Sequence, residues 1–133
     1  MKSLGYALLF LLTGSTAVAA DDGRGERLFA DHCAACHGLE ARGDGPMASI
    51  LSVAPSDLTM LRAANEAVFP TDRIVRRIDG TTEVLAHGGP MPIFGVLLEG
   101  PSDVVLAPDG SEIIASESIV EITTWLQGIQ EDN

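Results

Sequence analysis

Positive charge is scarce in this chain of 133 residues. Lysine and arginine together number 8, against 19 aspartates and glutamates, so the formal net charge is −11. So acidic a surface repels polyanions, which argues against nucleic acid or anionic lipid as a partner. It favours docking on the basic surface of a partner, and it equally suits a protein that needs its charge only to stay soluble.

A membrane-spanning run is also lacking. The apolar stretch Leu4–Leu12 is shorter than the roughly 20 residues that cross a bilayer comfortably. It follows the lone lysine, Lys2, and precedes small residues at 17–20, which is the order of a secretory signal peptide. We therefore predict a signal peptide at 1–20, one mature domain at 21–133 and a periplasmic location. An uncleaved membrane anchor is the alternative. Removal of residues 1–20 leaves seven arginines against 19 carboxylates, a formal charge of −12.

Cysteine is scarce too, and its two copies stand together in Cys33-Ala34-Ala35-Cys36-His37. Two thiols at this spacing can add to the vinyl groups of one porphyrin, and the following histidine supplies an axial ligand to the iron. A thioredoxin-like redox pair would need a βαβ pattern, and a zinc site would need further ligands at matching spacing. Because neither is present, we predict one covalent haem c on Cys33 and Cys36, with His37 on the iron and no disulfide. Bacteria attach haem c outside the cytoplasm, which agrees with export.

The best candidate for the other axial ligand is Met91. Pro90 and Pro92 flank it and restrict its backbone, so its thioether is presented in a fixed direction. A soft sulfur ligand raises the reduction potential, which suits an electron carrier. His87 is the competitor and would give a bis-histidine iron at lower potential. The remaining methionines and histidine are not expected on the iron. Met60 is expected in the core, Met47 lies too close to the attachment site, and His32 is expected at the surface.

Most of the mature chain predicts short helices. A first helix is expected to begin near Asp22 as N-cap and to reach the cysteines. Residues 38–47 contain three glycines and a proline and predict a loop. A short helix is expected after Pro55, capped by the side chain of Ser56 or Asp57. Another is expected at about 71–78, where Gly80 ends it.

The C-terminal part predicts a hairpin followed by the clearest helix. Val104 and Ile114 lie in two apolar runs around Asp109-Gly110, which is typical of a hairpin turn. Ser118 and Glu121 have the spacing of a capping box. The residues after them form an apolar stripe at helical spacing and are expected in the core: Ile119, Ile122, Trp125, Leu126 and Ile129.

Together these residues resemble the class I c-type cytochromes, which are small monohaem electron carriers. The attachment motif and the Met-Pro segment are the specific parts, and the resemblance covers nearly all of the mature chain except residues 95–116. It implies an all-α, cytochrome c-like helical fold around one covalent haem, with a small β-hairpin insertion near 104–114. In this family a glycine and an aromatic residue on the first helix pack against an aromatic residue of the last helix. Gly25, Phe29 and Trp125 match these positions.

The resemblance also assigns contacts around the haem. In the family, the carbonyl of a Gly-Pro proline accepts the Nδ1 proton of the axial histidine, and Gly45-Pro46 match that pair. Pro46 is therefore expected to orient His37. Arginines often bond the haem propionates, and no spacing selects one among those available: Arg62, Arg73, Arg76 and Arg77.

The function implied by the resemblance is that of an electron carrier and not of an enzyme. Single electrons would pass between redox partners, such as membrane respiratory complexes or a periplasmic oxidoreductase, while His37 and Met91 stay on the iron. Contact with a membrane would come through such partners or through an uncleaved N-terminal anchor. Two alternatives stay open. One is a haem c subunit of a periplasmic dehydrogenase or respiratory complex, with residues 95–116 as the subunit contact. The other is a five-coordinate haem that binds a gas or peroxide.

Overall fold

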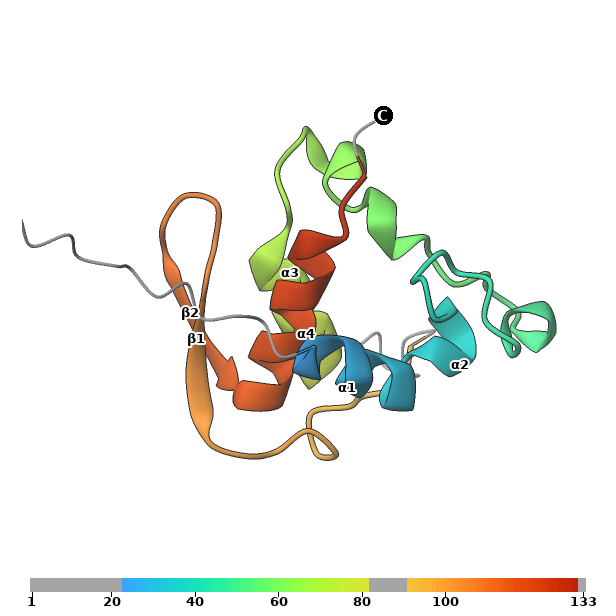
Figure 1. Cartoon of the computed structure of the whole chain (residues 1–133), viewed down its shortest axis with the longest axis horizontal. Coiled ribbons are helices and arrows are strands. Elements are labelled where there is room, and N and C mark those ends of the chain that lie inside the picture. Colours follow the sequence, from blue (N-terminus) through green and yellow to red (C-terminus); the bar gives the residue numbers. More distant parts are fainter. Residues whose placement is uncertain (1–22, 82–90, 132–133) are drawn as a thin grey trace, which may run out of the picture.

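Two helices from opposite ends of the chain pack together at the centre of the structure (Figure 1). The computed structural model describes residues 23–81 and 91–131. The α-helices and strands are α1 (Arg24–His32), α2 (Ala34–His37), α3 (Thr71–Asp79), β1 (Ser102–Leu106), β2 (Glu112–Ser116) and α4 (Glu117–Gly128). Three short 3₁₀ helices join them: η1 (Ala48–Ile50), η2 (Leu58–Met60) and η3 (Ala63–Asn65). The described part is thus mostly helical with one small sheet, in agreement with the prediction.

The crossing of α1 and α4 depends on Gly25. A Cβ atom added to this glycine would lie 2.8 Å from the Cβ of Trp125 and would overlap the carbonyl oxygen of Glu121. Next to the crossing, the ring of Phe29 packs on the indole of Trp125, with ring centroids 4.7 Å apart, and Phe29 is buried. The helices approach closely because no side chain stands between them. The packing that the resemblance implied for these three residues is confirmed.

The apolar face of α3 completes the core. Ile74, Val75 and Ile78 are buried, whereas the arginines of this helix are exposed. Gly80 ends the helix in the left-handed conformation, with φ 85°. The core joins residues from all parts of the described chain: Phe29, Cys33, Ala34, Ala41, Phe69, Ile74, Val75, Ile78, Leu98, Val105, Ile119, Val120, Ile122 and Leu126. This arrangement confirms the prediction of a helix near 71–78 that Gly80 ends.

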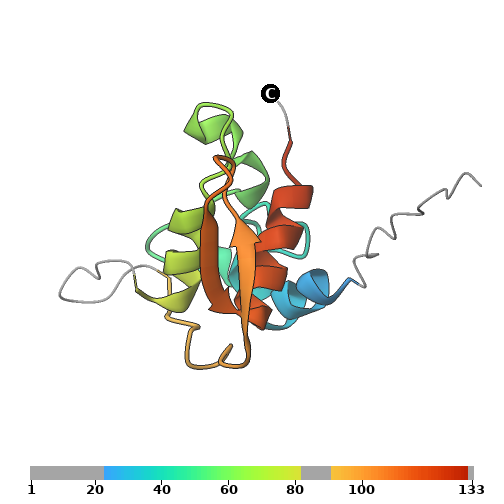
Figure 2. The same cartoon turned by 90° about the vertical axis from the view of Figure 1, so that its left-hand side faces the viewer.

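The predicted hairpin is present, and its two faces differ. Strands β1 and β2 pair antiparallel, with Val104 opposite Ile114 and Val105 opposite Ile113. Gly110 takes φ 84° in the turn, which the Asp-Gly sequence favours. Val105 is only 4% exposed and packs on the core, whereas its neighbours on the other face point to solvent. In Figure 2 the hairpin lies in front of the helices as the outermost layer on its side of the molecule.

The caps of α1 and α4 differ from the sequence predictions. Helix α4 begins at Glu117, and the hydroxyl of Ser116 accepts from the Ile119 amide at 3.4 Å. The predicted capping box of Ser118 and Glu121 is therefore wrong by two residues, because β2 runs directly into the helix and fixes its first turn. Helix α1 is preceded by Gly23 with φ 71°. Asp22, the predicted N-cap, lies outside the described residues, as does the predicted signal peptide at 1–20.

The segment before α3 confirms two further predictions. Residues 38–47 form a loop, in which Gly38 and Gly43 take φ of 79° and 81°. The short helix after Pro55 is the single 3₁₀ turn η2, and the carboxylate of Asp57 accepts from the Thr59 amide at 2.9 Å. Asp57 is thus the cap. Among the helices of residues 23–81 and 91–131, none is long and apolar enough to cross a membrane.

Two residues just after α4 bind the segment between α2 and α3. The Gln130 side chain accepts from the Arg62 amide at 2.8 Å and donates to the Leu58 carbonyl at 2.8 Å. The Glu131 amide donates to the Thr59 carbonyl at 2.9 Å, and its carboxylate pairs with Arg42. Gln130 and Glu131 therefore bind the segment that connects α2 with α3.

Candidate haem site

The two cysteines and His37 lie on one helical turn. Cys33 separates α1 from α2, and its carbonyl accepts from the amides of Cys36 at 3.2 Å and His37 at 3.0 Å. Both cysteines are free thiols; Cys33 is buried, and Cys36 is half-buried. A single turn thus carries two thiols and one imidazole, which is the set needed to attach one porphyrin and to bind its iron.

Ser56 fixes the orientation of the His37 ring. The Nδ1 atom lies 3.1 Å from the Ser56 carbonyl oxygen, so Nδ1 carries the proton and donates to it. The Nε2 lone pair is then left for a metal. Burial lowers the pKa of His37, and the hydrogen bond to Ser56 only partly opposes this effect. The imidazole is therefore neutral at neutral pH, which is the form that ligates iron.

The partner of His37 differs from the predicted one. The resemblance assigned the carbonyl of Pro46, whereas the hydrogen bond observed goes to Ser56. Gly43 explains the difference, since a Cβ there would lie 3.1 Å from the carbonyl carbon of Ser56 and the backbone passes close against it. Gly45 instead packs on α2, where its amide donates to the Cys36 carbonyl at 3.1 Å. Sequence reasoning missed Ser56. The one trace of this approach in the sequence is the glycine at position 43, whose positive φ appears only in the structure.

The thiol of Cys33 suits a thioether rather than a metal bond. Burial, assisted by the neighbouring Cys36, raises the pKa of Cys33 to about 11. The thiolate that a metal would require is disfavoured here, whereas a neutral thioether carries no charge into the buried site. Within the described ranges, no group of three histidine, cysteine or acidic residues is arranged to hold a metal ion. These residues fit covalent haem better than zinc.

The segment that begins with Met91 is anchored to the end of α3. The Phe94 amide donates to the Ile78 carbonyl at 3.1 Å. A Cβ at Gly95 would lie 2.9 Å from the Asp79 carboxylate and would overlap the Asp79 carbonyl oxygen. Met91 itself is half-buried and packs against the core. Ligation of iron by Met91 stays a prediction, and its competitor His87 lies outside the described residues.

The close approach at Gly95 gives a testable prediction. Because the added methyl group of Gly95→Ala meets backbone, the segment that carries Met91 must shift. We expect the melting temperature of the holoprotein to fall by on the order of 5 °C, and the absorption band of sulfur-ligated ferric iron to weaken. Gly100→Ala is the matched control, because nothing lies within 4 Å of its added Cβ. A Gly95→Ala protein with both the native band and the native melting temperature would contradict this anchoring role.

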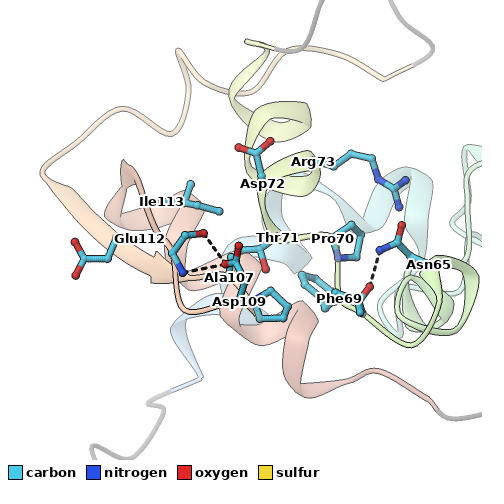
Figure 3. Close-up of a pocket in the computed structure, with 13 residues that line it drawn as sticks. Asn65, Phe69, Pro70, Thr71, Asp72, Arg73, Ala107, Asp109, Glu112 and Ile113 are labelled. Atoms are coloured by element: carbon cyan, nitrogen blue, oxygen red, sulfur yellow. Dashed lines mark hydrogen bonds between the residues drawn. The ribbon is translucent and has the colours of Figure 1, made fainter.

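A hollow elsewhere in the structure is not part of this site. It has a volume of about 660 Å³ and lies between residues 65–73 and the hairpin turn (Figure 3). Neither cysteine, His37 nor Met91 is among its lining residues. The hollow is therefore separate from the residues that would hold the haem.

Comparison with known proteins agrees with these residues. The family model described as cytochrome c matches residues 23–99, which is more than half of the chain. No curated protein and no solved structure matches. The matched residues contain the attachment motif and end shortly before β1. The resemblance and the predicted cofactor are thereby confirmed: the chain belongs to the cytochrome c family and binds haem c covalently.

Proposed function

We propose that this cytochrome c is a one-electron carrier exported to the periplasm, with thioether bonds to Cys33 and Cys36 and with His37 and Met91 on the iron. The observation that carries the proposal is the hydrogen bond from His37 Nδ1 to the Ser56 carbonyl at 3.1 Å. It leaves Nε2 as the only ring atom free to bind a metal. It also holds the imidazole in one orientation, so that the proximal ligand does not move when the charge of the iron changes.

Residues of the chain supply what a carrier needs. The haem provides the one-electron change, and the protein keeps both axial ligands in place so that little rearranges. Cys33 is 8% exposed, and Phe29 packs within 6.5 Å of the His37 ring, measured between ring centroids. Such burial excludes water from the proximal side and, together with a thioether ligand from Met91, raises the reduction potential.

The acidic charge supports a basic redox partner. With a formal charge of −11, the chain is attracted to a positively charged surface at long range. The partner could belong to a membrane respiratory complex or be a periplasmic oxidoreductase, and in either case the attraction would weaken as salt increases.

Carbon monoxide separates this proposal from a gas- or peroxide-binding haem. We expect the absorption spectrum of the ferrous holoprotein not to change when carbon monoxide is added at neutral pH, because His37 and Met91 occupy both ligand positions of the iron. We also expect the oxidised protein to show the weak near-infrared band of a sulfur–ferric iron bond. Rapid binding of carbon monoxide, together with absence of this band, would establish a five-coordinate iron and reject the carrier.

A second candidate is a haem c subunit of a dehydrogenase or respiratory complex. It uses the same haem site, and the observation that favours it is the hairpin β1–β2, which lies beyond the residues that the family model matches. Isolation of the native protein at its own molecular mass, free of other chains, would favour the soluble carrier over the subunit.

A further inference from the structure

The outward face of the hairpin is apolar where a solvent-exposed face should be polar. Residues alternate along each strand, and Val105 points to the core. The outward positions Val104, Leu106 and Ile114 are 42%, 59% and 71% exposed. An antiparallel sheet with one free face normally carries polar side chains there. We call these three residues the hairpin stripe.

The strand register makes the hairpin stripe continuous. Val104 lies directly opposite Ile114, and Leu106 is two positions further along the same face of β1. Leu106 itself lies opposite Glu112. The stripe is therefore one patch that spans both strands and not three isolated side chains.

Carboxylates border the hairpin stripe, and the hairpin itself, residues 101–116, contains neither lysine nor arginine. Residues 78–133 contain ten of the 19 acidic residues and neither lysine nor arginine. Asp103, Asp109 and Glu112 are exposed on the hairpin. In the part of the chain that the structure describes, none of these three forms a salt bridge. An apolar centre with a negative border is thus presented to solvent.

The hollow of about 660 Å³ continues this surface at the turn end of the hairpin. Glu112 and Asp109 line it from the hairpin, and Asp72 lines it from the first turn of α3 (Figure 3). Arg73 also lines the hollow, and Asp72 already pairs with Arg76. The carboxylates left for a basic side chain of a partner are therefore those of Asp109 and Glu112, next to the apolar patch.

The hairpin and the haem-binding turn occupy different ends of the molecule. In Figure 1 the hairpin and α2 lie on opposite sides, with α1 and α4 between them, and in Figure 2 the hairpin lies in front of the helices. A partner seated on the hairpin stripe would therefore leave α2 accessible to a second redox protein.

We propose that the hairpin stripe is a docking surface for another protein, whose contact surface has an apolar centre bordered by lysines and arginines. Charge excludes a second copy of this chain as the natural occupant, because two such faces would bring their carboxylates together. Burial of the three side chains provides affinity, and the carboxylates select the basic partner. The proposal does not depend on Met91, since the surface is complete in the polypeptide.

Photo-crosslinking in cells that naturally produce the chain tests the proposal. The photoreactive amino acid p-benzoylphenylalanine replaces Ile114 in one full-length variant and Ile50 in the control. These two isoleucines are matched, since each is 71% exposed and only Ile114 lies on the hairpin. We expect one other protein to be crosslinked from position 114 and not from position 50.

Binding of that purified protein to the holoprotein then tests the chemistry. We expect Ile114→Ser to weaken the dissociation constant about tenfold, as truncation of an interface anchor does, and Ile50→Ser to leave it unchanged. We expect Glu112→Gln to weaken binding about threefold at low salt and to have no effect at high salt. Unchanged haem spectra and melting temperatures in these variants show that folding and the haem site are intact.

Several outcomes would overturn the proposal. They are no adduct at position 114, an adduct only with a second copy of the chain, equal losses from Ile114→Ser and Ile50→Ser, or binding that does not depend on salt. None of them affects the carbon monoxide and near-infrared tests, so failure of the docking surface is distinguishable from failure of the carrier function.

Discussion

Gly25→Ala is expected to destabilise the holoprotein by about 3 kcal/mol, at the upper end of what overpacking costs. The new methyl group would lie 2.8 Å from the Cβ of Trp125 and would overlap the backbone of Glu121, which cannot move aside as a flexible side chain does. The helices α1 and α4 must then separate, and the contact of Phe29 with Trp125 weakens. Thermal unfolding followed by circular dichroism should show a melting temperature lower by about 10 °C or more.

Gly128→Ala is the matched control for this experiment. Gly128 is the last residue of α4, and nothing lies within 4 Å of its added Cβ. Because alanine favours the helix over glycine, we expect this substitution to stabilise the protein by up to about 1 kcal/mol. The same chemical change should therefore have opposite signs at the two helical glycines. Equal effects at both positions would show that close contact at the crossing does not limit stability.

Met91→Ala is expected to have the largest effect on the haem. Loss of the thioether should abolish the near-infrared band of the oxidised protein and let the ferrous protein bind carbon monoxide. The reduction potential should fall by on the order of 100 mV, a modest part of the roughly 0.8 V over which axial ligands set haem potentials. Spectroelectrochemical titration of the wild type and the variant measures both changes.

Met47→Ala is the control for Met91→Ala. Met47 is 42% exposed and follows Gly45-Pro46 in the loop after α2. We expect it to keep the native band and potential. If Met91→Ala also keeps both, Met91 is not the ligand, and His87→Ala becomes the decisive variant for a bis-histidine iron.

The parts of the fold that local pattern determines were predictable. Apolar spacing placed α3, and the Asp109-Gly110 turn placed the hairpin, because each depends on residues close together in the sequence. The contact of Gly25 and Phe29 with Trp125 joins opposite ends of the chain, and no local pattern contains it. That contact was available only through resemblance to a family.

The two predictions that differ from the structure are the cap of α4 and the hydrogen-bond partner of His37. Both depend on how the surrounding backbone is arranged. Ser116 and Ser118 are both acceptable helix caps, and the strand before the helix decided between them. Ser56 reaches His37 because Gly43 lets the backbone come close, which requires a loop conformation that the sequence only permits. The attachment motif itself was recognised from its five consecutive residues, since the chemistry demands their spacing.

The crossing of α1 and α4 also bears on when the two thiols are accessible. The cysteine motif is complete once residue 37 has emerged, whereas the crossing needs residues up to 128. Cys33 is 8% exposed in the folded chain, so its thiol is more accessible before the core closes. We therefore expect the porphyrin to be joined more readily to an exported chain that has not yet folded than to one in which α4 already packs on α1.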